Sequence, residues 1–387
     1  MQNPNAIVSS TVRLDPPLER GAAEMLREER GISVVLDGGR RVRLDPADPR
    51  SPGFAQVLDG LSRQQRPVYV EVDPATTHIT NVLIPHVTRV VAMSTGPNGI
   101  DVEIEMSHAR HVLRTDSSDF AELQARLRES LQGGSVVILT EDDSHNIIDV
   151  RGFTPGPDSP LPPLPPFPRR ELPKWPWPFG WLRDLLLRIW WWPCWPWRWF
   201  HWRCMSAAYA QQVFDAMAAT TCAPLTVPPP CIPFMYPDDG CWGRAHEMCR
   251  LMTLMGVSPK KVWIQRVAPG YLHVDTRNNP NCFVEWNWHV APTVCVRRRR
   301  WWFCPWSQEM VIDPALFTTP VTKAAWKAAQ NNPGATLTNS DWTIFYLWGN
   351  ITDPTFVQTN QVLATYRLQL QLRSQAPAGP PPYAYCP

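Results

Sequence analysis

A proline-rich stretch at residues 151–178 divides this chain of 387 residues into two parts. Proline removes a backbone donor and favours extended polyproline II, so such a stretch cannot build a hydrophobic core. We therefore expect a linker that is exposed to proteolysis, between separately folded parts. The predicted divisions are 1–150, the linker region 151–204, a second folded part at 205–372 and a proline-rich tail at 373–387.

The charge balance argues against a nucleic-acid partner. Lysine and arginine total 37 and aspartate and glutamate 35, which gives a net charge of +2 and no basic excess to attract phosphates. The first residues contain no apolar segment of the secretory-signal type, and no clean run of about 20 apolar residues predicts a membrane span. Localisation stays open at this level.

The first part of the chain contains an internal duplication, with copies at about 31–85 and 99–152. Each copy has a strand-like segment, a short amphipathic helix that begins near Phe54 or Phe120, and two further strand-like segments. Period-two alternation of apolar residues flanks the helix in both copies. We predict two small β-α-β-β units, without a nucleophile–base pair in either.

A tryptophan-rich segment, Gly180–Trp202, follows the linker. Tryptophan and arginine together favour the headgroup zone of a membrane, so contact with a membrane surface is one interpretation. The other is a connector whose tryptophans pack on a folded domain. A full span is disfavoured, because each charged residue would cost about 2.5–3.5 kcal/mol at the bilayer centre.

Cys241 is the candidate nucleophile. The residues after Asp239-Gly240 have helical periodicity up to Gly256, which places Cys241 at the start of a helix. There the helix dipole and free backbone N–H groups favour a thiolate and can bind an oxyanion. A lone cysteine before a helix is weak evidence, because buried structural cysteines are common.

Two later segments supply candidate partners. Alternation in CFVEWNWHVAP predicts a strand that carries His289 on the face opposite Trp286 and Trp288, and EMVIDPALF predicts a strand ending at Asp313. The order Cys, His, Asp is that of papain-type cysteine enzymes. By contrast, His246 lies about 140° around the helix from Cys241, which indicates a structural role.

The blocks PCIPFMYPDDGCWGRAHEM, VEWNWHVAP and VIDPALFTTPVTKAAW resemble the bacterial protein glutaminase family, over about residues 205–370. The resemblance implies an α+β fold of the papain/transglutaminase type, with Cys241 as nucleophile, His289 as base and acid, and Asp313 as orienting residue. It also implies a disulfide between Cys222 and Cys231, and hence an oxidising destination outside a bacterial cell.

Each N-terminal copy resembles the propeptide of that family, most clearly in RVRLDP and FAQVLDGLSRQQRPVYVEV. The resemblance implies an intramolecular inhibitor that covers the active site until it is removed. Two copies in place of one are a departure from the family, and which of them reaches the active site stays open. A second departure is the insertion CVRRRRWWFCPW, interpreted as a hairpin that Cys295 and Cys304 could close.

The implied reaction is hydrolysis of glutamine side chains in proteins or peptides to glutamate and ammonia, through a thioester and without cofactor or metal. Trp242, Trp286 and Trp288 are candidate walls of the substrate cleft. Two alternatives remain. A transglutaminase would transfer the same thioester to an amine, and a toxin-like membrane-active protein would act through Gly180–Trp202 instead.

Overall fold

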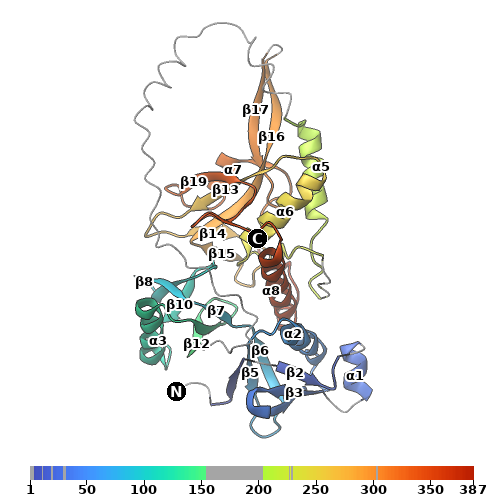
Figure 1. Cartoon of the computed structure of the whole chain (residues 1–387), viewed down its shortest axis with the longest axis vertical. Helices are drawn as coiled ribbons and strands as arrows, with labels where there is room; N and C mark the ends of the chain where they lie inside the picture. Colours follow the sequence, from blue (N-terminus) through green and yellow to red (C-terminus); the bar gives the residue numbers. More distant parts are fainter. Residues whose placement is uncertain are drawn as a thin grey trace.

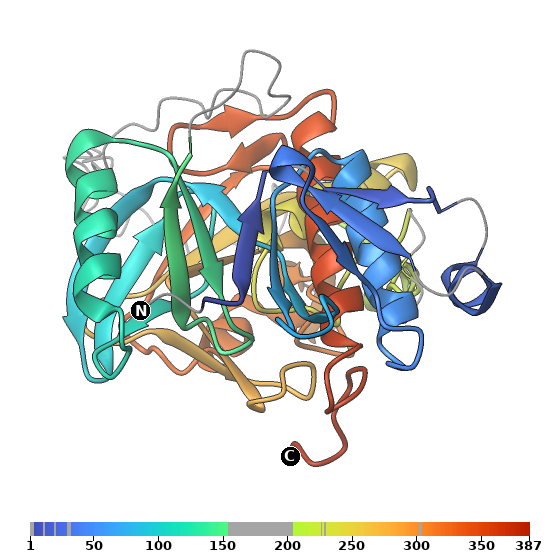
Figure 2. The same ribbon diagram turned by 90° about the horizontal axis from the view of Figure 1, so that it is seen from below.

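The computed structural model describes residues 4–10, 12–18, 21–28, 32–153, 204–225, 227, 230–301 and 304–387. The tryptophan-rich segment and nearly all of the predicted linker lie outside these residues. In the described part, no helix has the length and apolar character needed to cross a membrane. Two N-terminal units lie side by side at one end of the molecule, and the C-terminal part forms the other end (Figures 1 and 2).

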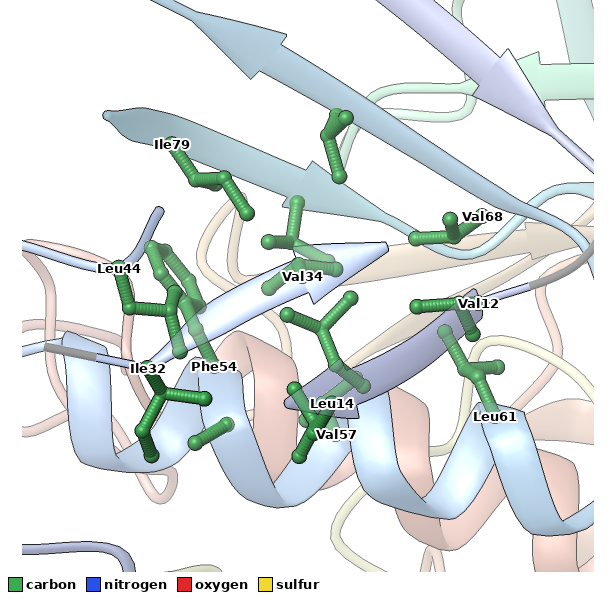
Figure 3. Packing of buried hydrophobic residues seen from close by; sticks show 14 of the residues in the cluster. Val12, Leu14, Ile32, Val34, Leu44, Phe54, Val57, Leu61, Val68 and Ile79 are labelled. Carbon is green, nitrogen blue, oxygen red and sulfur yellow. The ribbon is translucent and has the colours of Figure 1, made fainter. Parts of the chain in front are cut away.

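The first N-terminal unit contains two three-stranded antiparallel sheets, ordered β2-β3-β4 and β1-β5-β6. Its elements are β1 (Ala6–Ser9), β2 (Val12–Asp15), α1 (Ala22–Glu28), β3 (Ser33–Leu36), η1 (Asp37–Gly39), β4 (Arg41–Arg43), α2 (Ser51–Arg63), β5 (Val68–Val72) and β6 (Ile79–Leu83). The apolar face of α2 packs on both sheets, with Phe54, Val57 and Leu61 against Val34 and Ile79 (Figure 3). Burial of these side chains stabilises the unit.

The second unit has the same order of strands around one helix, without counterparts of α1 and η1, and its sheets are β8-β9-β10 and β7-β11-β12. Its elements are β7 (His86–Thr88), β8 (Val90–Gly96), β9 (Gly99–Ile104), β10 (His111–Arg114), α3 (Phe120–Gly133), β11 (Val137–Glu141) and β12 (Ile147–Gly152). The segments predicted in both copies coincide with strands and helices of the expected type. Strands β1, β2, β7 and β8 precede the predicted copies and were not expected.

The C-terminal part is built on a five-stranded antiparallel sheet, ordered β18-β17-β16-β13-β19, with α6 packed against β16 and α8. Its elements are α5 (Ala207–Ala218), α6 (Cys241–Leu254), β13 (Lys260–Gln265), β14 (Leu272–Asp275), β15 (Phe283–Trp286), β16 (Trp288–Trp301), β17 (Cys304–Val311), β18 (Val321–Thr322), α7 (Lys323–Ala328), β19 (Thr336–Asp341), β20 (Ile344–Tyr346), β21 (Ile351–Thr352) and α8 (Val357–Arg373). This mixture of helices and antiparallel sheets is the predicted α+β class. The predicted hairpin is the extension of β16 and β17 away from the N-terminal units (Figure 1).

Helix α8 connects the two parts of the molecule. It packs on α6 and also on α2 of the first N-terminal unit. Leu368 of α8 belongs to the core of that unit. The side chain of Leu368 lies so close to Gly60 in α2 that a Cβ at Gly60 would come within 2.6 Å of it. The division predicted at residue 205 therefore separates two parts that share buried apolar surface.

Among the described residues, three disulfides join segments of the C-terminal part: Cys204–Cys295, Cys222–Cys231 and Cys282–Cys386. Pairing of Cys222 with Cys231 agrees with the expectation. The suggested closure of the hairpin by Cys295 and Cys304 is wrong, because Cys295 pairs with Cys204. Met205 lies beside Val296, and the Met205 N–H donates to the Cys295 carbonyl. This pairing brings Cys204 to the strand that carries Cys295.

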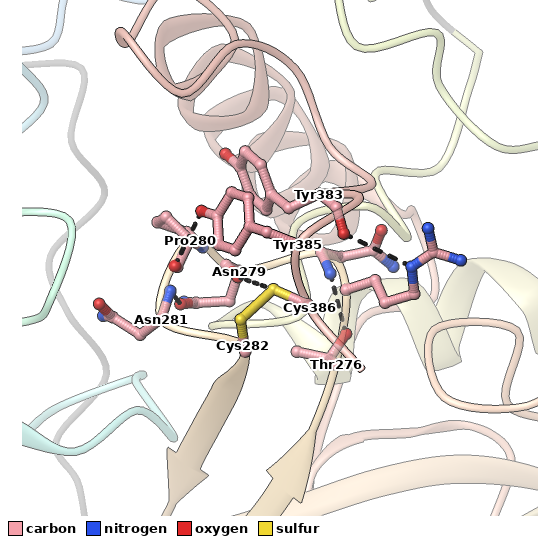
Figure 4. The surroundings of a disulfide bond; sticks show 10 residues. Thr276, Asn279, Pro280, Asn281, Cys282, Tyr383, Tyr385 and Cys386 are labelled. Atoms are coloured by element: carbon pink, nitrogen blue, oxygen red, sulfur yellow. Dashed lines mark hydrogen bonds between the residues drawn. A yellow bond between two sulfur atoms is a disulfide. The ribbon is translucent and has the colours of Figure 1, made fainter.

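The Cys282–Cys386 disulfide anchors the proline-rich tail (Figure 4). The Tyr385 hydroxyl donates to the Pro280 carbonyl at 2.9 Å, and the Tyr383 N–H donates to the Arg277 carbonyl at 2.7 Å. The tail is therefore part of the folded C-terminal part.

We predict that a Cys282→Ser/Cys386→Ser variant loses about 2–4 kcal/mol of unfolding free energy, because the disulfide restricts the unfolded chain. Urea unfolding under non-reducing conditions measures the change. A Tyr385→Phe control, which keeps the disulfide and removes one exposed hydrogen bond, should lose at most about 1 kcal/mol. Equal stability of the double variant and the wild type would contradict the prediction.

Candidate active site

The candidate nucleophile lies at the first residue of α6, as the sequence predicted. The residue before it, Gly240, has φ of 81° and caps the helix. A Cβ at Gly240 would come within 2.3 Å of the Tyr366 ring, so both the left-handed backbone and the close approach require glycine there. This turn delivers Cys241 to the helix start with its backbone N–H still free of helical bonding.

The candidate base and its orienting residue are in direct contact. His289 lies on β16, and Asp313 lies just beyond the end of β17, its neighbour in the sheet. His289 Nε2 is 2.9 Å from Asp313 Oδ2, and the indole N–H of Trp326 donates to the same oxygen at 2.9 Å. Burial disfavours the ionised form of Asp313, but the charge and hydrogen bond of His289 and the bond from Trp326 outweigh it and lower the pKa.

The structure also brings His289 to Cys241. Together with His108, these two residues offer ligand-type atoms that all lie within 4.8 Å of one another. His289 Nδ1 is buried, and no described residue forms a hydrogen bond with it. With Nε2 directed at Asp313, the nitrogen left to accept a proton from the thiol is Nδ1.

The predicted position of His289 relative to Trp286 is wrong, whereas Trp288 and His289 are consecutive residues of β16. The expected single strand is interrupted at Asn287, where the chain passes from the two-stranded sheet β14-β15 into the five-stranded sheet. Because the alternation of faces does not continue across this break, the His289 ring stacks on Trp286, with centroids 4.5 Å apart and planes at 18°. Trp326 stacks on His289 at 5.5 Å.

A segment of the second N-terminal unit lies in the site and pairs with β15. Ala109 forms an antiparallel bridge with Trp286. On either side of it, the Arg110 N–H donates to the Glu285 carbonyl at 3.0 Å and the Asn287 N–H donates to the His108 carbonyl at 2.8 Å. The segment thus extends the sheet by backbone hydrogen bonds, in the manner of an added strand.

His108 occupies the space next to the thiol and was not predicted from the sequence. Its ring is surrounded by the candidate cleft walls, with centroids 6.1 Å from Trp242 and 5.3 Å from both Trp286 and Trp288. The Cys241 N–H points to His108 Nε2 at 3.4 Å. Burial, together with the nearby positive groups, lowers the pKa of His108 well below its ordinary value, so the ring is neutral.

The thiol itself is shielded from solvent. Cys241 is 1% exposed, and burial raises its pKa well above the ordinary value, because a thiolate loses solvation in this environment. A neutral thiol is a poor nucleophile. In this conformation, then, His289 lies near the thiol, but the cysteine is inaccessible to solvent and its ionised form is disfavoured.

The loop before Cys241 holds this arrangement in place. Asp239 accepts from the N–H of His108 at 3.0 Å and from the Tyr366 hydroxyl at 2.6 Å. Arg244, one turn along α6, donates to the carbonyl of Tyr236 at 2.8 Å and to that of Asp239. These residues were not predicted, and the one available signal was the pair of acidic residues next to the nucleophile.

His246 and Cys249 point away from this site. His246 Nδ1 is 2.8 Å from the buried ammonium of Lys261, which agrees with the structural role predicted for it. Cys249 is a buried free thiol whose pKa burial raises to about 12. In the described part of the chain, neither residue forms a hydrogen bond with His289 or Asp313.

A family model described as glutaminase matches residues 210–330. No curated protein matches the chain. A crystal structure of pro-protein-glutaminase is similar with 21% identity and a TM-score of 0.48, over 79% of this chain and 99% of that one. The NMR structure of protein-glutaminase from Chryseobacterium proteolyticum has 27% identity and a TM-score of 0.38, over 48% of this chain and 97% of that one.

A crystal structure of protein-glutaminase has 29% identity and a TM-score of 0.36, over 43% of this chain and 89% of that one. The family match contains Cys241, His289 and Asp313. The resemblance of this chain to the protein glutaminase family is therefore confirmed over residues 210–330.

Proposed function

We propose that the C-terminal part hydrolyses glutamine side chains in proteins or peptides, with Cys241, His289 and Asp313 as a triad of the papain/transglutaminase type. The observation that supports this most is the partnerless Nδ1 of the buried His289 beside Cys241, with Nε2 on Asp313. An orienting carboxylate of this kind selects the tautomer that can take the cysteine proton. The glutaminase match favours glutamine as the amide.

In the proposed reaction, His289 takes the Cys241 proton and the sulfur attacks the carbon of the side-chain carboxamide. The tetrahedral intermediate collapses as the imidazolium protonates the leaving nitrogen, which departs as ammonia and leaves a thioester. His289 then deprotonates a water molecule, which attacks the thioester. Glutamate leaves, and the proton returns to the sulfur.

The backbone N–H of Cys241 is the proposed oxyanion donor, because it lies at a helix start where developing negative charge is stabilised. In the structure this N–H faces His108 Nε2 at 3.4 Å. The imidazole of His108 therefore lies where the substrate carboxamide would have to sit. We propose that Trp242, Trp286 and Trp288, which surround it, form the walls of the substrate cleft.

We further propose that the N-terminal half keeps the enzyme latent and that the second copy is the one that blocks the cleft. Supporting this are the pairing of Ala109 with Trp286 along β15, the burial of Cys241 and the position of His108. A substrate protein cannot reach the thiol while this segment is in place. Cleavage between the two halves would be the activating step.

We predict that a chain beginning at Cys204, which keeps the disulfide to Cys295, releases ammonia from a glutamine-containing protein at least about tenfold faster than the full chain, a difference of about 1.4 kcal/mol. In that shorter chain, Cys241→Ala should abolish release. Asp313→Asn should lower kcat about 10³–10⁴-fold through loss of the correct tautomer.

Cys249→Ala, which removes the other buried free thiol on α6, is the matched control and should retain activity. Equal rates for the full and shorter chains would argue against latency. Absence of ammonia release from both would argue against the amidase assignment.

We predict that His108→Gly increases the alkylation rate of Cys241 in the full chain by at least about tenfold. A decrease of about 1.4 kcal/mol in the free energy needed to expose the thiol is sufficient for this increase. Because burial raises the pKa of the thiol, removal of the ring should also move the pH profile of alkylation toward lower pH. Mass spectrometry of the Cys241 peptide measures both effects. The control is His78→Gly, at a half-exposed position, and an unchanged rate in His108→Gly would contradict the blocking role.

We predict that the shorter chain releases ammonia without incorporating a labelled primary amine into a glutamine peptide. Transglutaminases form the same thioester and differ in the acceptor. Parallel measurement of ammonia and of amine incorporation separates the two. Efficient incorporation would assign acyl transfer instead of deamidation.

A further inference from the structure

Three imidazoles of the second N-terminal unit converge on one buried carboxylate, next to the blocked active site. The shortest approaches to Glu141, at the end of β11, are 2.5 Å from His111 Nδ1, 2.8 Å from His145 Nδ1 and 3.1 Å from His86 Nε2. The His86 and His145 rings both lie 5.6 Å from the ring of His111. The four side chains come from β7, β10, β11 and the β11–β12 turn, so tertiary structure alone assembles them.

His145 lies between two carboxylates. Its Nδ1 faces Glu141 at 2.8 Å, and its Nε2 faces Asp238 of the C-terminal part at 3.4 Å. A cation bound at Nδ1 is compatible with this geometry, because the proton of a neutral imidazole then lies on Nε2 and faces Asp238.

The outward nitrogens have the partners that metal-bound histidines use. His111 directs Nδ1 at the centre of the cluster, and its Nε2 lies 2.8 Å from the Ser107 hydroxyl. His145 has the carboxylate of Asp238 on its outer side. Such outer contacts fix the tautomer and orientation of ligating histidines.

We propose that His111, Glu141 and His145, with His86 as a fourth ligand, bind a divalent transition-metal cation of the zinc type. The ligand atoms of the first three lie within 4.8 Å of one another. Tetrahedral zinc holds nitrogen and oxygen ligands at about 2.0–2.2 Å, hence roughly 3.4 Å apart, which small side-chain movements achieve. The imidazole donors favour zinc over calcium or magnesium. The ion takes no part in the proposed reaction.

The cluster borders a cavity at Glu141. The cavity has a volume of about 460 Å³, and its lining includes the carboxylates of Asp142 and Asp143 and the guanidinium groups of Arg50 and Arg373. A cation can approach Glu141 from this side. Ligand side chains that are 0–14% exposed then separate it from bulk water.

The bound ion would strengthen the blocked state. His111 is three residues from His108, which lies in the segment along β15. His145 contacts Asp238. The next residue, Asp239, accepts a hydrogen bond from the His108 N–H. The ion therefore connects two turns of the second unit to the loop before the nucleophile. This consequence rests on the proposed latency, whereas ion binding does not.

The test is direct measurement of zinc in the full chain. The protein is loaded with zinc, desalted and analysed by elemental mass spectrometry, in wild-type and Cys241→Ala forms. The alternative cluster of His108, Cys241 and His289 would require the thiol, so about one ion per chain is expected in both forms. Cobalt(II) substitution should show no thiolate-to-metal absorption.

Glu141→Gln, which keeps the side-chain shape, and His111→Ala should each weaken zinc affinity at least about tenfold, as measured by competition with a chromophoric chelator. His273→Ala, at a histidine of the C-terminal part outside the cluster, is the control. Wild type that retains no zinc, or variants that bind like wild type, would overturn the proposal.

If a variant fails to fold, the wild type decides, since chelation should lower its Tm and zinc should restore it. Because no readout depends on ammonia release, failure of this proposal and failure of the proposed deamidation are distinguishable.

Discussion

The buried ion pair between Arg373 and Asp238 is the interaction on which the geometry of the candidate active site depends. Arg373 Nη1 lies 2.6 Å from Asp238 Oδ2, and both side chains are almost fully buried. Loss of one partner from such a pair leaves an unpaired buried charge, at a cost of about 3–5 kcal/mol. The pair fixes the end of α8 to the loop that leads to Gly240, and therefore fixes where α6 begins. Asn279 and the indole of Trp286 bind the same residue, Asp238, from the other side.

The burial that organises the candidate site also disfavours the chemistry proposed for it. Desolvation favours the protonated form of Cys241 and the neutral form of His108, so the imidazole proposed to block the site and the candidate nucleophile face each other without charge. Removal of the segment that contains His108 would expose the backbone N–H of Cys241 and restore solvent to the thiol. In the proposed latent state, His108 occupies the aromatic-walled site, and in the proposed active state the substrate occupies it. The proposed triad has the same geometry in both states.

Local patterns predicted much of the fold and of the candidate site. Period-two alternation located β3, β5, β9 and β11, and the helical repeat after Gly240 located the start of α6. The pattern failed at Asn287, where the chain changes sheets, because alternation applies only within one strand. His108 and Trp326 reach the candidate site from distant parts of the chain, so no periodic pattern in the sequence indicated them.

The sequence by itself determined the strand–helix order of the first part and the identity of Cys241, His289 and Asp313 as candidates; the linker stays a prediction from its composition. These follow from short-range periodicity, backbone chemistry and family motifs. Only the tertiary structure decided that Cys204 pairs with Cys295, that His108 enters the site along β15 and that three histidines meet at Glu141. Each of these depends on contacts between residues far apart in the chain, and such contacts are set by packing and not by spacing along the sequence.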